Sequence, residues 1–363
     1  MRARGGYGVA VALIGLLAAG CSGGGDSDGK DGGDSGDRTA AAATNAPAPG
    51  FPVTVTDCAG KRTTFTSPPK AIVTSNASSL ELLLRLGAGD KVIGTGFPPG
   101  RGAMPAPYDA RARRVPVLGQ AVVPKEKLLG SGADVYIDTF ASMGGMGGMG
   151  DTPTEAEYRA AGIKHLYLKS TACAAMSKEP MTDLTAVEAD VTTFGAVTGT
   201  SARAAELVDG MRRTVGAVTR AIADVPESER PTYFFFDYDA GTEQPTAVCD
   251  RQVANAVITL AGARNVFSDC HGGFRQVGWE DVIARDPDWI QLGVRNHGSP
   301  AANAKAFDAA ETWLTSNPAT KGLKAVREKH FLRIGSERTT IAGVGDADTV
   351  RDIARTLYPG KVS

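Results

Sequence analysis

The sequence predicts an α/β protein with two Rossmann-like lobes that are joined by a long α-helix. Short apolar strand segments alternate with amphipathic helical segments, which is typical of parallel βαβ units. Two blocks of sequence recur in the same order in the two halves of the chain. Between the halves, residues 182–223 contain no proline and favour helix. A chain of 363 residues is long enough for two such lobes.

The composition excludes several other classes of protein. The 39 Lys and Arg residues nearly balance the 40 Asp and Glu residues, so the sequence gives no support for a strongly basic nucleic-acid-binding surface. Hydrophobic residues make up 42% of the chain, which excludes disorder throughout. No segment after the N-terminal signal approaches the roughly 18 apolar residues of a membrane span, so we expect a soluble mature protein.

The first 20 residues have the features of an export signal. Basic residues precede an apolar run from Val9 to Ala19, and residues 17–21 read Leu-Ala-Ala-Gly-Cys. This ending resembles the lipobox of bacterial lipoproteins. We therefore expect residues 1–20 to be a signal peptide and Cys21 to be the lipidated first residue, with the protein anchored on the outer face of the cytoplasmic membrane. An unmodified cysteine in a cleaved peptide is the alternative.

The segment 21–50 is predicted to be a disordered tether. It consists of Gly, Ser, Asp, Ala and Pro with almost no large apolar side chain. Such a segment cannot bury enough surface to offset the entropy of ordering.

Four cysteines remain when Cys21 is set aside, and an exported chain can hold disulfides. Three pairings are possible. The simplest keeps each bridge within one half of the chain, Cys58 with Cys173 and Cys249 with Cys270. Metal binding is the rival interpretation, although no pair has the two-residue spacing of a zinc site.

The N-terminal lobe is predicted to span residues 51–181. Residues 51–66 alternate apolar and polar positions around a turn at 57–60, which indicates a hairpin. A strand at 71–74 follows, then a helix with Leu80, Leu83 and Leu84 on one face that ends at Gly87, and then a strand at 91–95.

The repeated blocks predict that the C-terminal lobe, residues 226–363, has the same design. Residues 83–93 and 257–267 share a helix-turn-strand pattern. Residues 126–137 and 280–291 share an acid, two apolar residues, a three-residue turn, an Asp and a strand. The offsets between copies are 174 and 154 residues, so the first half carries about twenty additional residues between its blocks, which we assign to 97–117.

Residues 182–225 are predicted to be connecting helices. From Ser201 onward, apolar residues recur at helical spacing up to Ile222. A helix of about 23 residues is roughly 35 Å long, which is enough to span two lobes and limit their hinge motion.

Together these blocks resemble the solute-binding proteins of bacterial ABC importers, in the class with two α/β lobes and a rigid connecting helix that serves iron-siderophores, cobalamin and haem. The resemblance covers residues 51–358, with its most specific segments at 79–87, in the two Glu-to-Asp blocks and at 347–354. It implies a monomeric extracytoplasmic protein that captures a ferric siderophore and delivers it to a permease driven by an ATPase. The paired cysteines are most similar to the siderophore branch. The alternatives are cobalamin or haem as ligand, a secreted enzyme, or a sequestering lipoprotein without an importer.

Two glutamates occupy equivalent places in the two halves. Glu126 and Glu280 each open a short helix, where a carboxylate meets the positive end of the helix dipole. That is the purely structural explanation. The resemblance implies that one glutamate on each lobe docks onto arginines of the permease, and both positions here carry Glu.

Open α/β sheets bind ligands at the carboxyl ends of their strands, so two facing lobes place these ends around one cleft. Arginine suits carboxylate or catecholate oxygens, while aromatic residues supply flat apolar walls. Each residue at such a place has ordinary surface or core as its alternative role. The predicted ligand-binding residues are Asn76, Phe97, Phe140, Met143, Tyr238, Arg275, Trp279, Arg295, His297 and Arg338.

Residues 142–150 form an unusual run of Met and Gly, which could serve as an adaptable flap over a bulky ligand, bind Cu(I), or be disordered.

The four histidines are scattered, so we expect no directly bound metal. Haem would need His297, His271 or Tyr238 as an axial ligand. Residues 51–363 contain no Gly-x-Ser-x-Gly, no phosphate loop and no His-Glu-x-x-His. We therefore expect binding without catalysis and no cofactor other than the bound chelate.

Overall fold

The computed structural model describes residues 48–140 and 152–362. The predicted signal peptide, Cys21, most of the predicted tether and the Met-Gly segment with Met143 lie outside these residues. Within them, no helix combines the length and apolar character needed to cross a membrane.

The N-terminal lobe is built on a parallel four-stranded sheet with the order β4-β3-β5-β6. The expected hairpin precedes it. The strands are β1 (Val53–Thr56), β2 (Arg62–Phe65), β3 (Ile72–Thr74), β4 (Val92–Thr95), β5 (Val135–Asp138) and β6 (Lys164–Tyr167). The helices are α1 (Ala77–Leu86), η1 (Gly89–Lys91), α2 (Ala106–Ala112), α3 (Lys125–Leu129), α4 (Glu155–Ala160), α5 (Lys169–Ala172) and η2 (Ala174–Met176).

The C-terminal lobe repeats this design with the sheet order β12-β11-β7-β9, again parallel throughout. A second antiparallel pair, β8 with β10, accompanies the sheet. The strands are β7 (Thr232–Asp237), β8 (Thr246–Val248), β9 (Arg264–Asn265), β10 (Phe274–Gln276), β11 (Trp289–Gly293) and β12 (Phe331–Leu332). The helices are η3 (Glu227–Glu229), η4 (Tyr238–Ala240), α8 (Val253–Leu260), α9 (Trp279–Arg285), α10 (Pro300–Ser316), α11 (Lys324–Arg327), α12 (Glu337–Thr340) and α13 (Asp346–Leu357).

The two sheets correspond strand for strand. Read from β9, the second sheet runs β9-β7-β11-β12, which matches β4-β3-β5-β6 in position along the chain. Gly87 after α1 and Gly262 after α8 occupy equivalent turns in the two lobes. Both have a left-handed backbone, with φ of 82° and 84°, a conformation that favours glycine. The additional residues of the first half include α2. The predicted fold class, two Rossmann-like lobes of one design, is confirmed; the domain boundaries drawn from the sequence remain a prediction.

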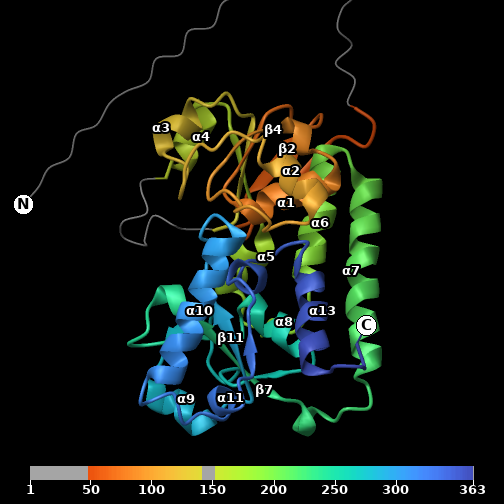
Figure 1. Cartoon of the computed structure of the whole chain (residues 1–363). Coiled ribbons are helices and arrows are strands. Elements are labelled where there is room, and N and C mark those ends of the chain that lie inside the picture. The colour runs from red at the N-terminus through yellow and green to blue at the C-terminus, as the bar shows by residue number, and fades with distance from the viewer. Residues whose placement is uncertain (1–47, 141–151, 363) are drawn as a thin grey trace, which may run out of the picture. The chain divides into compact units, whose positions relative to one another are not determined.

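The segment between the sheets forms a helical hairpin. The helices α6 (Thr185–Thr198) and α7 (Ser201–Ala221) are joined by a two-residue turn and pack against each other, and α7 also packs on α13 (Figure 1). A Cβ added to Gly195 would lie 2.3 Å from the Cβ of Ala204, so these helices approach closely because this position is glycine. The observed α7 has 21 residues, close to the predicted length.

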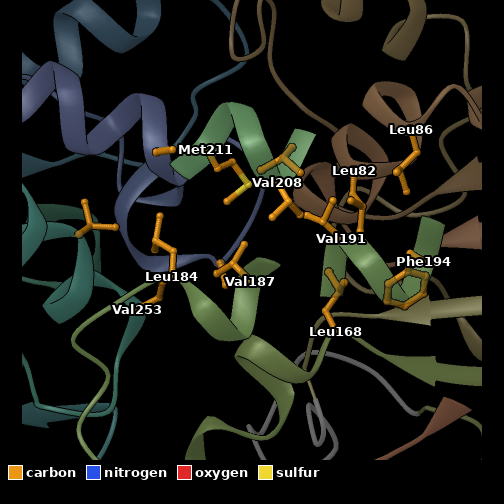
Figure 2. Close-up of a cluster of buried hydrophobic side chains, with 14 of the residues drawn as sticks. Leu82, Leu86, Leu168, Leu184, Val187, Val191, Phe194, Val208, Met211 and Val253 are labelled. Atoms are coloured by element: carbon orange, nitrogen blue, oxygen red, sulfur yellow. The ribbon is translucent and has the colours of Figure 1, made fainter. Parts of the chain in front are cut away.

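A continuous apolar core runs through the helices. Figure 2 shows Leu82 of α1 near Val191 of α6 and Val208 of α7 beside Met211, and Val253 of α8 belongs to the same cluster. The cluster extends from the N-terminal sheet at Val135 to Tyr233 and Val350 of the C-terminal lobe. The apolar faces of the connecting helices are therefore part of a core that both lobes share.

Both predicted disulfides are confirmed. Cys58 in the entry hairpin is bonded to Cys173 at the end of α5, with a Cα–Cα distance of 5.5 Å. Cys249 after β8 is bonded to Cys270, with a Cα–Cα distance of 4.9 Å. The first closes a sequence separation of 115 residues and the second one of 21. Each bridge stays within one half of the chain.

Candidate functional site

The carboxyl ends of the two sheets are joined by a direct contact between the lobes. The segment after Phe97 places the backbone N–H of Arg101 3.4 Å from the carbonyl oxygen of Gly298, to which it donates a hydrogen bond. A Cβ added to Gly100 would lie 1.9 to 2.2 Å from the amide atoms of Asn296, so this approach depends on the absence of a side chain there. We call the residues that follow β3, β4 and β5 the N-side strand ends, and those that follow β7 and β11 the C-side strand ends.

Asn76 lies at the centre of the N-side strand ends. It follows β3 and caps α1, because its Oδ1 accepts the backbone N–H of Ser79 at 3.1 Å. The hydroxyl of Thr139, which follows β5, donates to the same Oδ1 at 3.0 Å. The neighbouring Ala77 donates its backbone N–H to the carbonyl of Phe97, which follows β4. Asn76 is 3% exposed, and its Nδ2 is buried without a hydrogen-bond partner.

Phe97 has an unusual backbone for a large residue, with φ of 32°. This left-handed conformation is disfavoured for side chains with a Cβ. The conformation is held by two backbone hydrogen bonds, one from the Phe97 N–H to Ala121 and one to the Phe97 carbonyl from Ala77. Strain of this kind persists where the surrounding structure enforces it, and it is common at ligand-binding positions. Phe97 is half-buried.

Phe140, half-buried, follows β5, and its backbone N–H donates to Oδ1 of Asp138 at 3.1 Å. The other oxygen of Asp138 lies 3.4 Å from Nε2 of the buried His165. On its far side, His165 places Nδ1 2.7 Å from Glu155. The Asp138 carboxylate thus joins the end of β5 to Phe140, and the buried His165 of β6 lies beside it. Phe97 and Phe140 give the N-side strand ends two aromatic rings.

The C-side strand ends carry a compact set of charges. Asp237 and Asp239 flank Tyr238 at the end of β7, and Arg295 and His297 follow β11. Asp239 accepts the backbone N–H of Arg295 at 2.7 Å and lies 3.0 Å from Nε2 of His297. The Arg295 guanidinium lies 3.5 Å from Asp237. Burial raises the pKa of the Asp237 carboxyl, and Arg295 partly offsets this effect. The Arg295 side chain remains 54% exposed, so part of its guanidinium is free to meet a ligand.

Tyr238 and Trp279 belong largely to the core of the C-terminal lobe. Trp279, the first residue of α9, is 9% exposed, and its Nε1 donates to the carbonyl of Thr242 at 2.8 Å. Its ring packs against Phe236 and Trp313. Tyr238 is half-buried and meets Phe236 edge-on. The Trp279 ring therefore packs in the core of the lobe and does not form an open wall of the site.

Arg275 and Arg338 are exposed. Arg275 lies in β10 opposite Ala247, and Arg338 in α12 forms an ion pair of 2.7 Å with Asp352 of α13. No contact found among the described residues joins either arginine to Arg295 or His297. Their role in ligand binding stays a prediction.

Sequence reasoning missed Asp237, Asp239 and Thr139 as parts of the site. Asp237 and Asp239 could have been found, because two carboxylates directly follow a strand of buried aromatic residues. Thr139 had no distinguishing signal, since its importance comes from a hydrogen bond to Asn76, 63 residues away in sequence.

Glu126 and Glu280 are both exposed. Each lies in the first turn of its helix, α3 or α9. Ile283, one turn after Glu280, is also exposed, at 44%. Their role in docking onto the permease stays a prediction.

Two further features of the described residues bear on the site. A cavity of about 510 Å³ lies beside the amino end of β7, lined by Arg230, Arg264 and Asn265 among others, and none of the predicted ligand-binding residues lines it. His, Cys, Asp and Glu side chains in the described part of the chain do not gather in a group of three that could hold a metal ion.

Comparison with known proteins decides the family. Residues 72–337, most of both lobes, match the sequence family of periplasmic binding proteins. The chain belongs to this family. It is thus an ABC-type substrate-binding protein, a class whose members work with a membrane permease and an ATPase. Its homologues are binding proteins and not enzymes.

Two curated relatives are similar along most of this periplasmic binding protein. The uncharacterized ABC transporter substrate-binding lipoprotein YvrC of Bacillus subtilis is 23% identical over 99% of this chain and 98% of its own length. A cobalamin-binding protein of Halobacterium salinarum is 27% identical over 77% of this chain and 69% of its own length.

Solved structures show the same fold. An ABC-type Fe3+-hydroxamate transport system from Saccharomonospora viridis superposes with a TM-score of 0.69 at 24% identity, covering 85% of this chain and 99% of its own. The periplasmic heme-binding protein RhuT from Roseiflexus gives a TM-score of 0.60 at 20% identity, covering 80% of this chain and 99% of its own.

Proposed function

We propose that this periplasmic binding protein captures a ferric siderophore between the N-side and C-side strand ends and hands it to its permease. The observation that carries the proposal is the contact of Arg101 with Gly298, which brings together strand ends of different chemistry. Phe97 and Phe140 offer apolar rings on one side. Arg295 offers a partly exposed guanidinium on the other.

This pairing suits a bulky chelate with an apolar body and oxygen atoms at its rim. The planar guanidinium of Arg295 can donate two parallel hydrogen bonds to hydroxamate, catecholate or carboxylate oxygens. Asp237 and Asp239 act as positioning residues, because they hold Arg295 and His297 from behind. Aromatic rings bury the apolar part of the ligand. The iron ion is cargo, held by its chelator.

Haem is less well supported as the ligand. An axial haem ligand needs a free His nitrogen or Tyr oxygen. At the C-side strand ends, Nε2 of His297 is already paired with Asp239 at 3.0 Å. His271 pairs its Nδ1 with Asp250 at 2.8 Å and leaves its Nε2 open, but it follows Cys270 and belongs to neither set of strand ends.

Cobalamin is the second candidate. The Halobacterium relative bears the name of a cobalamin-binding protein and matches 77% of this chain. Cobalamin is bulky, and its rim carries amide groups that Arg295 and Asn76 could meet. It fits the same pairing of rings and donors.

Titration of the full chain separates these ligands. Three Trp residues are present, and Trp279 lies directly behind the C-side strand ends. We expect a ferric hydroxamate such as ferrioxamine B to quench tryptophan fluorescence with saturation, while iron-free chelator does not. Saturable binding of haemin or cyanocobalamin with no response to ferric hydroxamates or catecholates would refute the siderophore proposal.

We further propose that a lipid on Cys21 holds the protein at the outer face of the cytoplasmic membrane as a monomer. The support is the lipobox-like sequence at 17–21 and the name of the Bacillus relative as a lipoprotein. Mass spectrometry of the membrane fraction should find a diacylated Cys21 peptide. Genes for a permease and an ATPase beside this one would argue against a sequestering protein that lacks an importer.

A further inference from the structure

The side-chain amide of Asn76 is fixed in one orientation. Its Oδ1 receives the backbone N–H of Ser79 at 3.1 Å and the hydroxyl of Thr139 at 3.0 Å. A backbone N–H can only donate, so the oxygen end of the amide must face it. The Nδ2 end is therefore forced to the opposite side.

This Nδ2 has no hydrogen-bond partner although the residue is only 3% exposed. A buried donor without a partner is costly, since it loses its water without gaining a protein acceptor. The oxygen end of the amide and the backbone N–H of Asn76 do have partners, because Ser79 and Asn76 complete a reciprocal capping box. The Oδ1 end of the Asn76 amide therefore has partners within the protein, and the Nδ2 end has none.

The position of Asn76 in the fold indicates what kind of group this donor would bind. It stands where the ends of β3, β4 and β5 come together, beside Phe97 and Thr139. The first turn of α1, a helix of ten residues, adds the positive end of its dipole at the same point. An oxygen with negative charge or a strong carbonyl dipole is the group that both features favour.

We propose that Asn76 donates through Nδ2 to an acceptor oxygen of the bound chelate, a hydroxamate, carboxylate or amide carbonyl oxygen, on the N-side of the site. This assignment rests on the proposed function of the two strand ends as the chelate site. Arg295 then meets oxygens from the C-side, so the chelate is held by donors from both lobes. Because Nδ2 is buried, a ligand reaches it only after the side chains that cover it have moved.

Two substitutions isolate the donor. Asn76→Asp keeps the cap and the acceptor for Thr139 but replaces the donor with a second acceptor. Asn76→Ser keeps a helix-capping hydroxyl and removes the donor. We expect the affinity for ferrioxamine B to fall roughly ten-fold or more in both variants, with the larger loss in Asn76→Asp. Circular dichroism and thermal melting of the unliganded variants report whether they are folded.

Ser79→Ala is the matched control. It removes the Ser79 hydroxyl, which bonds the backbone N–H, the carbonyl and Oδ1 of Asn76, and leaves Nδ2 in place. We expect this variant to lose stability but to bind ferrioxamine B as the wild type does. If Ser79→Ala weakens binding as much as the Asn76 variants, Asn76 serves only to shape the helix start. If both Asn76 variants bind normally, the inference is overturned while the siderophore proposal stands.

A ligand without iron separates failure of this inference from failure of the proposed function. Should the wild type bind none of the chelates, saturation-transfer NMR with acetohydroxamate alone decides the role of Asn76. We expect a transfer signal in the wild type and its loss in Asn76→Ser. No signal in the wild type, or an equal signal in both proteins, would overturn the assignment.

Discussion

The backbone N–H of Arg101 donates to the carbonyl of Gly298 across the two lobes, at 3.4 Å. The contact exists because Gly100 has no side chain. A Cβ at this position would lie within 1.9 to 2.2 Å of the Asn296 amide atoms. A side chain at residue 100 would therefore require the Asn296 amide to move from its place at this contact.

Gly100→Val should weaken ligand binding by roughly ten-fold, because the added side chain pushes the Asn296 segment away. Fluorescence titration with ferrioxamine B measures the affinity, and small-angle X-ray scattering measures any increase in the radius of gyration. Gly273→Val is the control, since nothing lies within 4 Å of a Cβ there. Unchanged affinity in Gly100→Val would show that the contact plays no part in binding.

The left-handed backbone of Phe97 predicts that a polar substitution there is less destabilising than an apolar one. Phe97→Val should lose about 1 kcal/mol more free energy of unfolding than Phe97→Asn, since a β-branched residue tolerates φ of 32° least and Asn tolerates it well. Burial of apolar surface alone would give the opposite order. Urea denaturation followed by circular dichroism measures both variants. A less stable Asn variant would contradict the strain at this position.

The buried carboxyl of Asp190 predicts a dependence of stability on pH. Burial raises the pKa of Asp190 to about 6, although the backbone N–H groups of Lys169 and Ser170 donate to it. A raised folded-state pKa means that the folded chain binds the proton more tightly than the unfolded chain between about pH 4 and 6. The free energy of unfolding should therefore fall as pH rises through this window, by up to about 3 kcal/mol.

Asp190→Asn carries the test of this dependence. The variant cannot ionise at this position, so its stability should decline less than that of the wild type between pH 4 and 7. Urea midpoints across that range measure the difference. Asp346 and Asp237, whose pKa values are also raised by burial, act in the same direction in both proteins and cancel in the comparison. Parallel pH profiles would refute the prediction.

The exposed positions of Glu126 and Glu280 predict that their replacement affects transport but not ligand binding. Replacing both with Ala should abolish iron uptake in cells while the affinity for ferric hydroxamate stays unchanged, because neither residue belongs to the strand ends. Uptake of ⁵⁵Fe-labelled siderophore measures the first quantity and titration the second. A variant with Glu227 and Glu229 replaced by Ala removes two other exposed carboxylates and should transport normally. Normal uptake without Glu126 and Glu280 would exclude them as docking residues.

Much of the fold could be predicted because it is encoded in local patterns. The glycine after α1 and its counterpart after α8 mark equivalent turns, and the two Glu-to-Asp blocks predict the α3-β5 and α9-β11 units. The disulfide pairing followed from keeping each bridge within one half of the chain. These features depend on neighbours in sequence or on simple spacing.

The site was less predictable because its parts are defined by distant contacts. Asn76 and Arg295 could be placed at strand ends, but the free donor of Asn76 depends on Thr139, and the anchoring of Arg295 depends on Asp237 and Asp239. Trp279 follows the expected loop yet turns into the core, where Phe236 and Trp313 receive its ring. Arg338 meets Asp352 on α13. The carboxylates at the end of β7 have a local signature, but these pairings themselves have none.

The apolar cluster that passes from Val135 through α6 and α7 to Val350 also determines how the molecule can come apart. A fragment that ended between the two lobes would leave half of that cluster facing water. We therefore expect neither half to survive as an independent folding unit, and heating to melt the whole described region in a single cooperative step.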